Sequence, residues 1–522
     1  MNISIIPESA PFNTEQRAWL NGFLAGWLGL PGATAPAAVA PLPIDEPEPW
    51  HDPALVIADR LKLADAEPTP RRLMAAMAQL DCGACGYLCR TYAQAIASGV
   101  EKSLTLCSPG GSETSKALKR LLKEKSPPLN GDGASTKPSA SNGAPKNGTN
   151  GWSREKPFTA RILRSINLNR PGSDKETRHV ELELGQDGPK YAVGDSLGVY
   201  PENCGTLVAD LIATLQAQGD EQVRAPDGAE TTLANALTRH ACLAELTDPL
   251  IELLADKTAD PVEATRLRTL LDDDAPIAGF DVLDLLRHFP SARPAPADLL
   301  AALAPVKPRL YSISSSPKRH KGQVHLTVRR VTYEHNGRER KGVASTMLAD
   351  RVGPGSPIRV FIQKSHGFTL PDDPKTSVVM IGPGTGIAPF RAFLHERHAL
   401  AAPGPNWLFF GDQRSATDFL YEEELAAFLD QGLLTRLDTA FSRDQGRKVY
   451  VQDRITEQGA ELFRWLEAGA HIYVCGDAKR MAADVDRALH KVVREHGVMD
   501  DDASKSYLAR LSSTGRYRRD VY

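Results

Sequence analysis

The sequence lacks any long apolar segment and any strong charge of one sign. No hydrophobic run approaches the ~20 residues that a membrane-spanning helix needs. The 62 basic and 65 acidic side chains leave a formal net charge of -3, which gives no sign of nucleic-acid binding. With 41% hydrophobic and 24% charged residues, the composition is ordinary for a globular protein. A chain of 522 residues is too long for one core and favours about three domains.

A basic region is missing ahead of the apolar stretch near the start. Residues 18–30 are apolar, but Glu8 and Glu15 precede them against only Arg17. A secretory signal requires a positively charged start. We therefore expect residues 14–28 to form a core or partner-docking helix within an N-terminal segment (1–66), and we expect a cytoplasmic protein.

Cysteine is scarce outside one cluster. Four of the seven cysteines are Cys82, Cys85, Cys89 and Cys107, and the others are scattered. An odd count with one tight cluster favours a metal centre in a reducing compartment over a disulfide framework. In iron–sulfur proteins, four thiolates often reach one cluster from three close cysteines on a turn and one cysteine further along the chain. A four-cysteine zinc site uses similar spacings and is the alternative.

The cysteines belong to a compact unit (67–125), which a low-complexity segment follows. We expect helices at 70–80 and 90–98 around the cysteine turn, the second capped by Gly99. Residues 126–151 are rich in Gly, Ser, Asn and Pro, which is typical of a flexible linker. Such a tether suits a mobile electron shuttle, and a plain spacer fits equally well.

The remainder of the chain reads as two further domains, which gives an α/β multidomain fold. In 152–372 the strand signals fit an antiparallel β-barrel interrupted by a helix-rich insertion (203–302). In 373–522 strands alternate with helices, which predicts a parallel sheet whose ligands bind at the carboxyl ends of its strands. The strand signals are at 157–166, 178–184, 195–200, 309–314, 323–333 and 357–362 in the barrel, and at 377–381, 406–410, 434–440 and 470–475 in the parallel sheet.

The most informative single motif is a glycine-rich turn after the buried strand 377–381. It carries Gly382, Gly384, Thr385 and Gly386, and helical spacing resumes at 390–397. Such a turn directs backbone N–H groups and a helix N-terminus at an anion, and glycine lets a pyrophosphate approach the backbone. Glycines alone are weak support, but the strand–loop–helix context favours phosphate binding.

Five stretches in order resemble the ferredoxin–NADP reductase superfamily. They are RLYSISSS (309–316), GVAST (342–346), GPGTG (382–386), YVCGD (473–477) and RDVY (519–522). The helical insertion is typical of its diflavin reductase branch. Residues 440–453 and the RDVY ending are similar to the flavoprotein (alpha) components of NADPH sulfite reductases. The resemblance covers about 152–522 and implies an oxidoreductase that moves hydride from NADPH to FAD.

In that branch an FMN-binding flavodoxin domain precedes the barrel, and nothing in 1–151 resembles one. The cysteine unit occupies that place, and its CGACGYLC start and closing CSPGG resemble small 4Fe–4S domains in which the four cysteines are the ligands. We infer that a 4Fe–4S cluster replaces FMN as the one-electron carrier, so FMN is not expected.

The resemblance assigns the FAD contacts residue by residue. Arg309 suits bidentate pairing with the flavin pyrophosphate, and Tyr311 offers its ring to the isoalloxazine. Ser312 would hydrogen-bond flavin N5, the atom that accepts the hydride. The turn at 342–346 opens a helix whose N–H groups suit a second phosphate contact. The other implied contacts are Leu310, Thr327, Val328, Arg329, Tyr333, Gly342, Val343, Ala344, Ser345 and Thr346.

The resemblance also assigns the nicotinamide cofactor and the hydride-transfer site. Two cations and two hydroxyls suit the adenosine 2′-phosphate, which NADH lacks, so NADPH is favoured. Cys475 and Asp520 are placed beside Ser312 at the nicotinamide, and Tyr522 would cover the flavin face until nicotinamide displaces it. A lone cysteine in a strand is otherwise usually core, and a terminal aromatic usually frays. The residues that match the 2′-phosphate pocket are Ser442, Arg443, Lys448, Tyr450 and Gln452, and Asp484 is a further implied cofactor contact.

The implied acceptor is the hemoprotein (beta) subunit of a sulfite reductase, which places the chain in electron transport for cysteine biosynthesis. A nitrite or nitrate reductase is the main rival. Two other hypotheses stay open. In one, the cysteine unit is a zinc-bound docking module on a plain NADPH–FAD reductase. In the other, the chain is a non-catalytic binding paralogue, which intact Ser312, Cys475 and Asp520 argue against.

Overall fold

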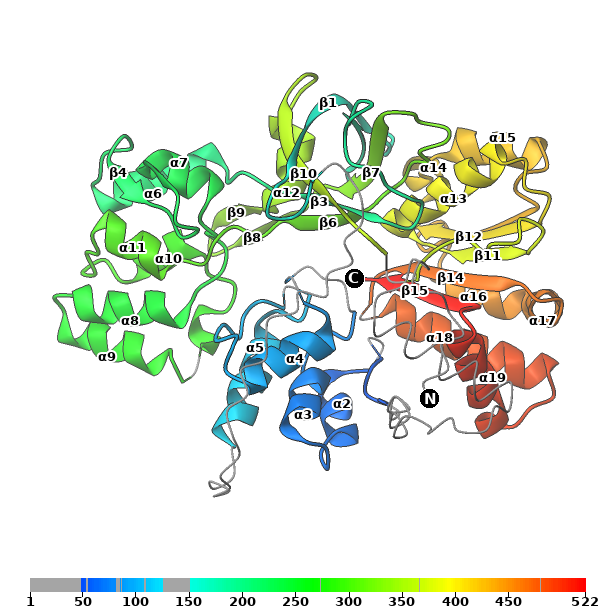
Figure 1. Ribbon diagram of the computed structural model, residues 1–522, viewed down its shortest axis with the longest axis horizontal. Helices are drawn as coiled ribbons and strands as arrows, with labels where there is room; N and C mark the ends of the chain where they lie inside the picture. The colour runs from blue at the N-terminus through cyan, green and yellow to red at the C-terminus, as the bar shows by residue number, and fades with distance from the viewer. Residues whose placement is uncertain are drawn as a thin grey trace, which may run out of the picture. The chain divides into compact units, whose positions relative to one another are not determined.

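The computed structural model describes residues 48–52, 55–80, 85, 87–107, 109–124, 151–272, 274–365, 367–478 and 480–522 (Figure 1). The chain divides into two units, 1–51 and 52–522, and the elements below all belong to the second. The expected helix at 14–28 and all but the last residue of the 126–151 segment lie outside the described residues. Among the described helices, none is long and apolar enough to cross a membrane.

The cysteine unit consists of short helices around a small apolar core. They are α2 (Ile57–Leu63), α3 (Thr69–Ala75), α4 (Cys89–Ala97) and α5 (Gly111–Lys123). Gly99, at φ +74°, follows α4 as expected. Helix α3 ends earlier than residue 80 because the chain turns after Ala75, with Gln79 at φ +60° and its side-chain amide donating to the Met77 carbonyl at 3.0 Å. The α2 and α5 helices were not predicted.

Six antiparallel strands form the barrel in the order β6-β3-β10-β1-β2-β7. A bridge between Ile313 and Leu326 joins the two edge strands and closes the sheet. Val324, Leu326 and Val328 alternate into the barrel core, so His325 and Thr327 face outward from it. The strands are β1 (Phe158–Asn167), β2 (Thr177–Glu183), β3 (Ser196–Val199), β6 (Arg309–Ser312), β7 (Gln323–Arg329) and β10 (Pro357–Gln363).

The single strand expected at 323–333 is divided. Strand β7 ends at Arg329, and a hairpin follows from β8 (Thr332–His335) to β9 (Arg338–Lys341). Asn336 and Gly337 both have positive φ, +51° and +68°, as a two-residue hairpin turn of the Asn-Gly kind requires. This turn chemistry was overlooked in the sequence.

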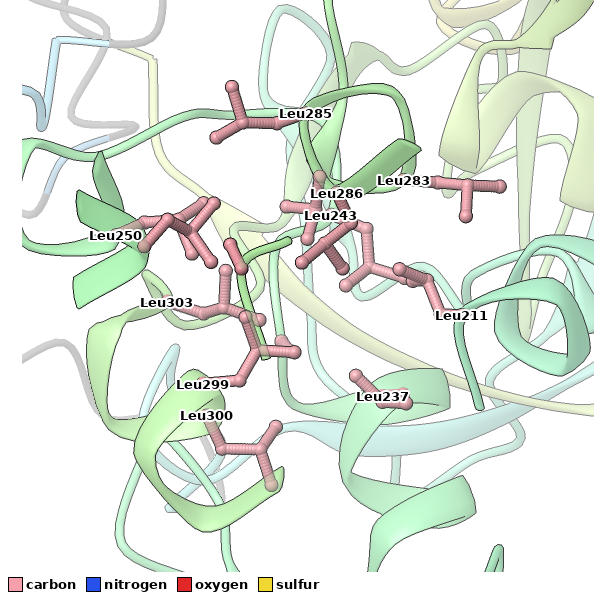
Figure 2. Packing of buried hydrophobic residues seen from close by; sticks show 14 of the residues in the cluster. Leu211, Leu237, Leu243, Leu250, Leu283, Leu285, Leu286, Leu299, Leu300 and Leu303 are labelled. Carbon is pink, nitrogen blue, oxygen red and sulfur yellow. The ribbon is translucent and has the colours of Figure 1, made fainter. Parts of the chain in front are cut away.

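The helical insertion has a leucine-rich core of its own. Figure 2 shows Leu243, Leu250 and Leu286 among the side chains gathered between its helices. Its elements are α6 (Gly205–Leu215), β4 (Gln222–Arg224), β5 (Glu230–Thr232), α7 (Leu233–Arg239), α8 (Asp248–Lys257), α9 (Pro261–Thr269), η1 (Ala275–Ile277), α10 (Val282–His288) and α11 (Pro296–Ala302).

The C-terminal domain is a parallel sheet in the order β13-β12-β11-β14-β15. Alternate residues of β11 enter two separate cores, so both faces are covered, by α13–α15 on one side and α16–α19 on the other (Figure 1). The strands are β11 (Val378–Ile381), β12 (Asn406–Asp412), β13 (Arg436–Phe441), β14 (His471–Gly476) and β15 (Tyr517–Val521). The helices are α13 (Ala388–Ala399), α14 (Ser415–Asp418), α15 (Glu422–Asp430), α16 (Val451–Glu457), α17 (Gly459–Glu467), α18 (Met481–His496) and α19 (Asp501–Ser513).

The predicted fold class is confirmed: a mixed α/β protein with an antiparallel sheet in one domain and a parallel sheet in the next. The parallel sheet orders its strands so that β14 and β15 end beside the end of β11, where the glycine turn begins. The carboxyl ends of these strands therefore form one edge, which is where such folds bind ligands.

Candidate functional site

Three predicted catalytic side chains meet where the barrel contacts the parallel sheet. Cys475 on β14 and Asp520 on β15 are direct register partners, so their side chains lie on the same face. Ser312, the last residue of β6, donates from Oγ to Asp520 Oδ2 at 2.8 Å. The Cys475 thiol points at the same oxygen, 3.9 Å away. One carboxylate oxygen thus collects donors from both domains.

Burial sets the protonation of this cluster. Removal from water raises the pKa of the Cys475 thiol well above its usual range, and the neighbouring Asp520 charge raises it further. The sulfur therefore keeps its proton at neutral pH. Burial also raises the pKa of the Asp520 carboxyl, and the hydrogen bonds from Ser312 and Cys475 only partly oppose that rise.

The glycine turn packs directly against this cluster. After β11 the chain forms a 3-10 turn, η3 (Gly384–Ile387), and then α13, as the strand–loop–helix motif predicts. A Cβ at Gly386 would lie 2.1 Å from the Cys475 carbonyl oxygen, so only glycine fits. The Thr385 hydroxyl lies 2.9 Å from the hydroxyl of Tyr522. The terminal tyrosine is thus held beside the turn, although the residue as a whole is 54% exposed.

The expected FAD contacts on the barrel fall into two groups. Arg309, Leu310 and Tyr311 are half-buried along β6, and Tyr311 packs against the barrel core. The second group is the turn at Gly342, which starts α12 (Val343–Thr346) and continues into a π-turn, η2 (Met347–Arg351). The hydroxyls of Ser345 and Thr346 donate to the Gly342 carbonyl, at 3.3 and 2.9 Å, and fix this turn.

Arg351 supports the same turn and was missed in the sequence. Its guanidinium donates to the backbone carbonyls of Glu202, Asn203 and Val343, all within 2.9 Å. It therefore fastens the Gly342 turn to the segment that follows β3. Burial lowers the pKa of this guanidinium. In the sequence, the only sign of this role is an arginine that closely follows the GVAST motif.

The remaining assigned barrel residues do not share one face. Val328 is in the barrel core, while Arg329 and Tyr333 are exposed. The Thr327 hydroxyl lies 2.7 Å from the Tyr421 hydroxyl, so this side chain faces the C-terminal domain. The structure thus brings the side chain of Thr327 to a polar cluster between the two domains.

That buried cluster is a second feature the sequence did not reveal. His179 Nδ1 lies 2.9 Å from the Tyr421 hydroxyl and His179 Nε2 lies 3.0 Å from Glu181. Burial and, to a smaller extent, the charge of Arg391 together lower the pKa of His179 to about 4, so the ring is neutral at neutral pH. Arg391 in turn pairs with Glu424 at 2.6 Å. A ring nitrogen of His325 lies near His179 and Glu181, and all three side chains are of types that can bind a metal ion. We interpret the set as a buried hydrogen-bonded joint between the domains, with a neutral His179 ring at its centre.

The residues expected at the adenosine end lie on the loop after β13 and on the helices α16 and α18. Arg443 NH1 donates to Asp174 Oδ2 at 2.6 Å. The backbone N–H of the neighbouring Ser442 donates to the Asp412 carbonyl at 2.9 Å. Lys448 and Tyr450 are exposed on the loop that leads into α16. Gln452 donates to Asp484 at 3.3 Å, which brings these two assigned residues together.

Three of the four clustered cysteines converge on one apolar pocket; the fourth, Cys82, lies outside the described residues. Cys85 is half-buried, whereas Cys89 at the start of α4 and Cys107 before α5 are buried. Tyr87, Tyr92 and other apolar side chains complete the lining. Burial raises the pKa of the Cys85 thiol. Thiol donors in an apolar setting fit an iron–sulfur cluster and also fit zinc.

Two neighbours adapt this pocket to metal-bound thiolates. A Cβ at Gly110 would lie 3.0 Å from Cys107 Sγ and 2.1 Å from Thr114 Oγ1, so the chain passes there only as glycine. Arg60, 7% exposed, donates from Nε to the Ala75 carbonyl at 3.1 Å within this unit. A buried cation in this unit favours anionic sulfur electrostatically.

Comparison with known proteins assigns each part to a domain family. The family described as "FAD binding domain" matches residues 151–347, and "Oxidoreductase NAD-binding domain" matches 380–487. A third, described as "Putative Fe-S cluster", matches 77–109. The fold and these matches define an FAD- and nicotinamide-dependent oxidoreductase with an iron–sulfur domain, which confirms the predicted cofactor classes.

The chain is a homologue of the sulfite reductase [NADPH] flavoprotein alpha-components, as the motifs predicted. It is 45% identical to that of Serratia proteamaculans over 375 residues, which are 71% of this chain and 62% of the relative. It is 43% identical to that of Bacillus subtilis over 401 residues, 76% of this chain and 66% of the relative. The chain thus spans less than two thirds of the length of these relatives.

Proposed function

We propose that the protein takes hydride from NADPH at FAD and passes the electrons singly, through a 4Fe–4S cluster, to the hemoprotein subunit of a sulfite reductase. The observation that carries this proposal is the meeting of Ser312, Cys475 and Asp520 at the end of the parallel sheet. The cysteine pocket supplies the second half of the electron route.

The protein side chains of the hydride site act by position and charge. Bound FAD supplies a group that accepts hydride and can release electrons one at a time. Asp520 is fixed by the Ser312 hydrogen bond, so its charge is in place before reaction. A buried carboxylate stabilises, by electrostatic attraction, the positive charge that develops on a nicotinamide ring as hydride leaves. The Cys475 thiol, which burial keeps protonated, adds no competing charge at this site.

The choice of NADPH over NADH is assigned to the loop after β13. Arg443 and Lys448 supply cations, and Ser442 and Tyr450 supply hydroxyls, at the carboxyl ends of the strands. A phosphate dianion gains charge-assisted hydrogen bonds from such a set, and a ribose hydroxyl gains few. With the cluster as one-electron carrier, the mechanism needs no FMN.

Replacing Arg443 with alanine tests this assignment. We expect the KM for NADPH to rise about tenfold to a hundredfold, the worth of a hydrogen bond to a charged group. The KM for NADH should stay nearly unchanged, because NADH lacks the 2′-phosphate. Steady-state ferricyanide reduction with each nucleotide measures both. Arg447→Ala, on the same loop but 85% exposed and paired with Asp453, is the matched control. Equal losses with NADPH and NADH would remove the 2′-phosphate role.

The acceptor is favoured by the names of the relatives, which are sulfite reductase components. A nitrite or nitrate reductase is the second candidate, since either would accept electrons from the same cluster. Mixing the purified chain with each acceptor hemoprotein under NADPH decides between them by which one is reduced. We place the protein in a reducing, cytoplasmic compartment, which its free thiols Cys204, Cys242 and Cys475 support.

These roles divide the chain into an N-terminal segment (1–66), a cluster domain (67–125), a linker (126–151), an FAD-binding barrel with its helical insertion (152–372) and an NADP-binding domain (373–522). Limited proteolysis should cut first within 126–151, because a segment rich in Gly and Ser is the kind of sequence at which proteases cut.

A further inference from the structure

Asp174, an acidic residue of the barrel domain, contacts Arg443, the arginine assigned to the 2′-phosphate. Asp174, in the loop between β1 and β2, accepts from Arg443 NH1 at 2.6 Å through Oδ2. The same oxygen accepts from Arg414 NH1 at 3.1 Å. Arg414 directly precedes α14, on the loop after β12. One carboxylate therefore bridges two guanidinium groups at the nucleotide edge of the sheet.

The loop that carries Asp174 is fastened on both sides of it. Lys175 forms an ion pair with Asp412 at the end of β12, and only 15% and 2% of the two side chains are exposed. Ser173 bonds to Asp418, which also accepts from Asn169 Nδ2 at 2.9 Å. These contacts fix the chain on both sides of Asp174, whose own side chain is 57% exposed and is held by the two arginines.

The Asp174 carboxylate and a bound phosphate would compete for the same arginine side chains. Hydrogen bonding to Arg414 and its charge, with those of Arg443, lower the pKa of Asp174, so the carboxylate is ionised at neutral pH. Two guanidinium groups shared by one carboxylate leave a net positive charge, which suits a second anion. A phosphate dianion at Arg443 must displace Asp174 or share the arginines with it.

We propose that Asp174 is an internal competitor for the 2′-phosphate, and that Arg414 is a second cation for that phosphate. The inference rests on the proposed use of NADPH. Before the nucleotide binds, Asp174 holds the side chains of Arg443 and Arg414 together. Its negative charge weakens the binding of nucleotides that carry a 2′-phosphate. It leaves binding of nucleotides with a free 2′-hydroxyl unaffected. Asp174 is thus a specificity residue supplied by the barrel domain to a site on the other domain.

The test compares 2′,5′-ADP with 5′-AMP, which differ only in the 2′-phosphate, by calorimetry on the full chain at low ionic strength. Asp174→Asn keeps the shape and removes the charge. We expect it to bind 2′,5′-ADP about fivefold more tightly, with 5′-AMP unchanged, and the gain to shrink in high salt. Arg414→Ala should bind 2′,5′-ADP more weakly. Asp256→Asn, an exposed carboxylate paired with Arg268 in the helical insertion, should change neither affinity.

Unchanged or weaker binding of 2′,5′-ADP to the Asp174→Asn protein would overturn the inference, since Asp174 would then only orient the arginines. A separate result bears on the proposed function. If the unmodified protein binds 2′,5′-ADP no more tightly than 5′-AMP, the 2′-phosphate site itself is refuted, and the competitor role falls with it.

Discussion

Replacing Asp520 with asparagine is expected to slow flavin reduction by NADPH about a hundredfold, the typical cost of removing one preorganised electrostatic partner. Asparagine keeps the shape and an acceptor for the Ser312 hydroxyl, so the loss reports the charge and not the packing. Stopped-flow absorbance of the flavin after mixing with NADPH measures the step directly, before any electron leaves for the cluster.

The pH profile separates a charge effect from a structural one. Because burial raises the pKa of Asp520, lowering the pH should protonate it sooner than an exposed aspartate and slow the unmodified enzyme. The Asp520→Asn enzyme should lack that pH-dependent loss. Asp502→Asn, a 95% exposed carboxylate paired with Lys505 on α19, is the control. If the Asp520→Asn enzyme binds FAD and NADP⁺ normally and keeps its full rate, the carboxylate has no role in hydride transfer.

Replacing Cys85 with alanine is expected to abolish electron delivery to the protein acceptor while sparing reduction of ferricyanide at the flavin. The thiol lies in the apolar pocket with Cys89 and Cys107, so its removal leaves an incomplete ligand set. The acceptor hemoprotein and ferricyanide are assayed side by side with NADPH.

The matched control for this variant is Cys204→Ala, a partly buried thiol at the start of α6 in the helical insertion. It should keep both activities. A different result would be that the Cys85→Ala protein loses both ferricyanide reduction and acceptor reduction. The cysteine unit would then be needed for the reductase fold and would not carry electrons.

Prediction of the fold from the sequence is most accurate where the hydrophobic pattern of a segment and a known motif indicate the same element. Apolar residues before Gly382 and helical spacing after it identify the β11–turn–α13 element from one short stretch. Strand β15 was found only as a terminal motif, because its residues Arg518, Arg519 and Asp520 are polar and read poorly as a strand. Its place at the sheet edge explains that composition.

Features that join distant parts of the chain could not be predicted. Asp174 and Arg443 are 269 residues apart, and nothing local marks either as a partner of the other. The joint of His179, Glu181 and Tyr421 likewise depends on how β2 faces the C-terminal domain. The resemblance supplied Ser312, Cys475 and Asp520, and the strand register supplies the reason that the last two meet. Cys82, outside the described residues, stays a prediction as the fourth ligand.

The central claim, a flavin-to-cluster shuttle, is tested most directly by the cofactor content of the protein purified without oxygen. Iron, acid-labile sulfide, zinc, FAD and FMN are measured on the same sample. The account predicts about four irons and four sulfides per chain, as in one cubane cluster, with FAD and without FMN. Stoichiometric zinc in place of iron and sulfide would contradict it and make the cysteine unit a docking module.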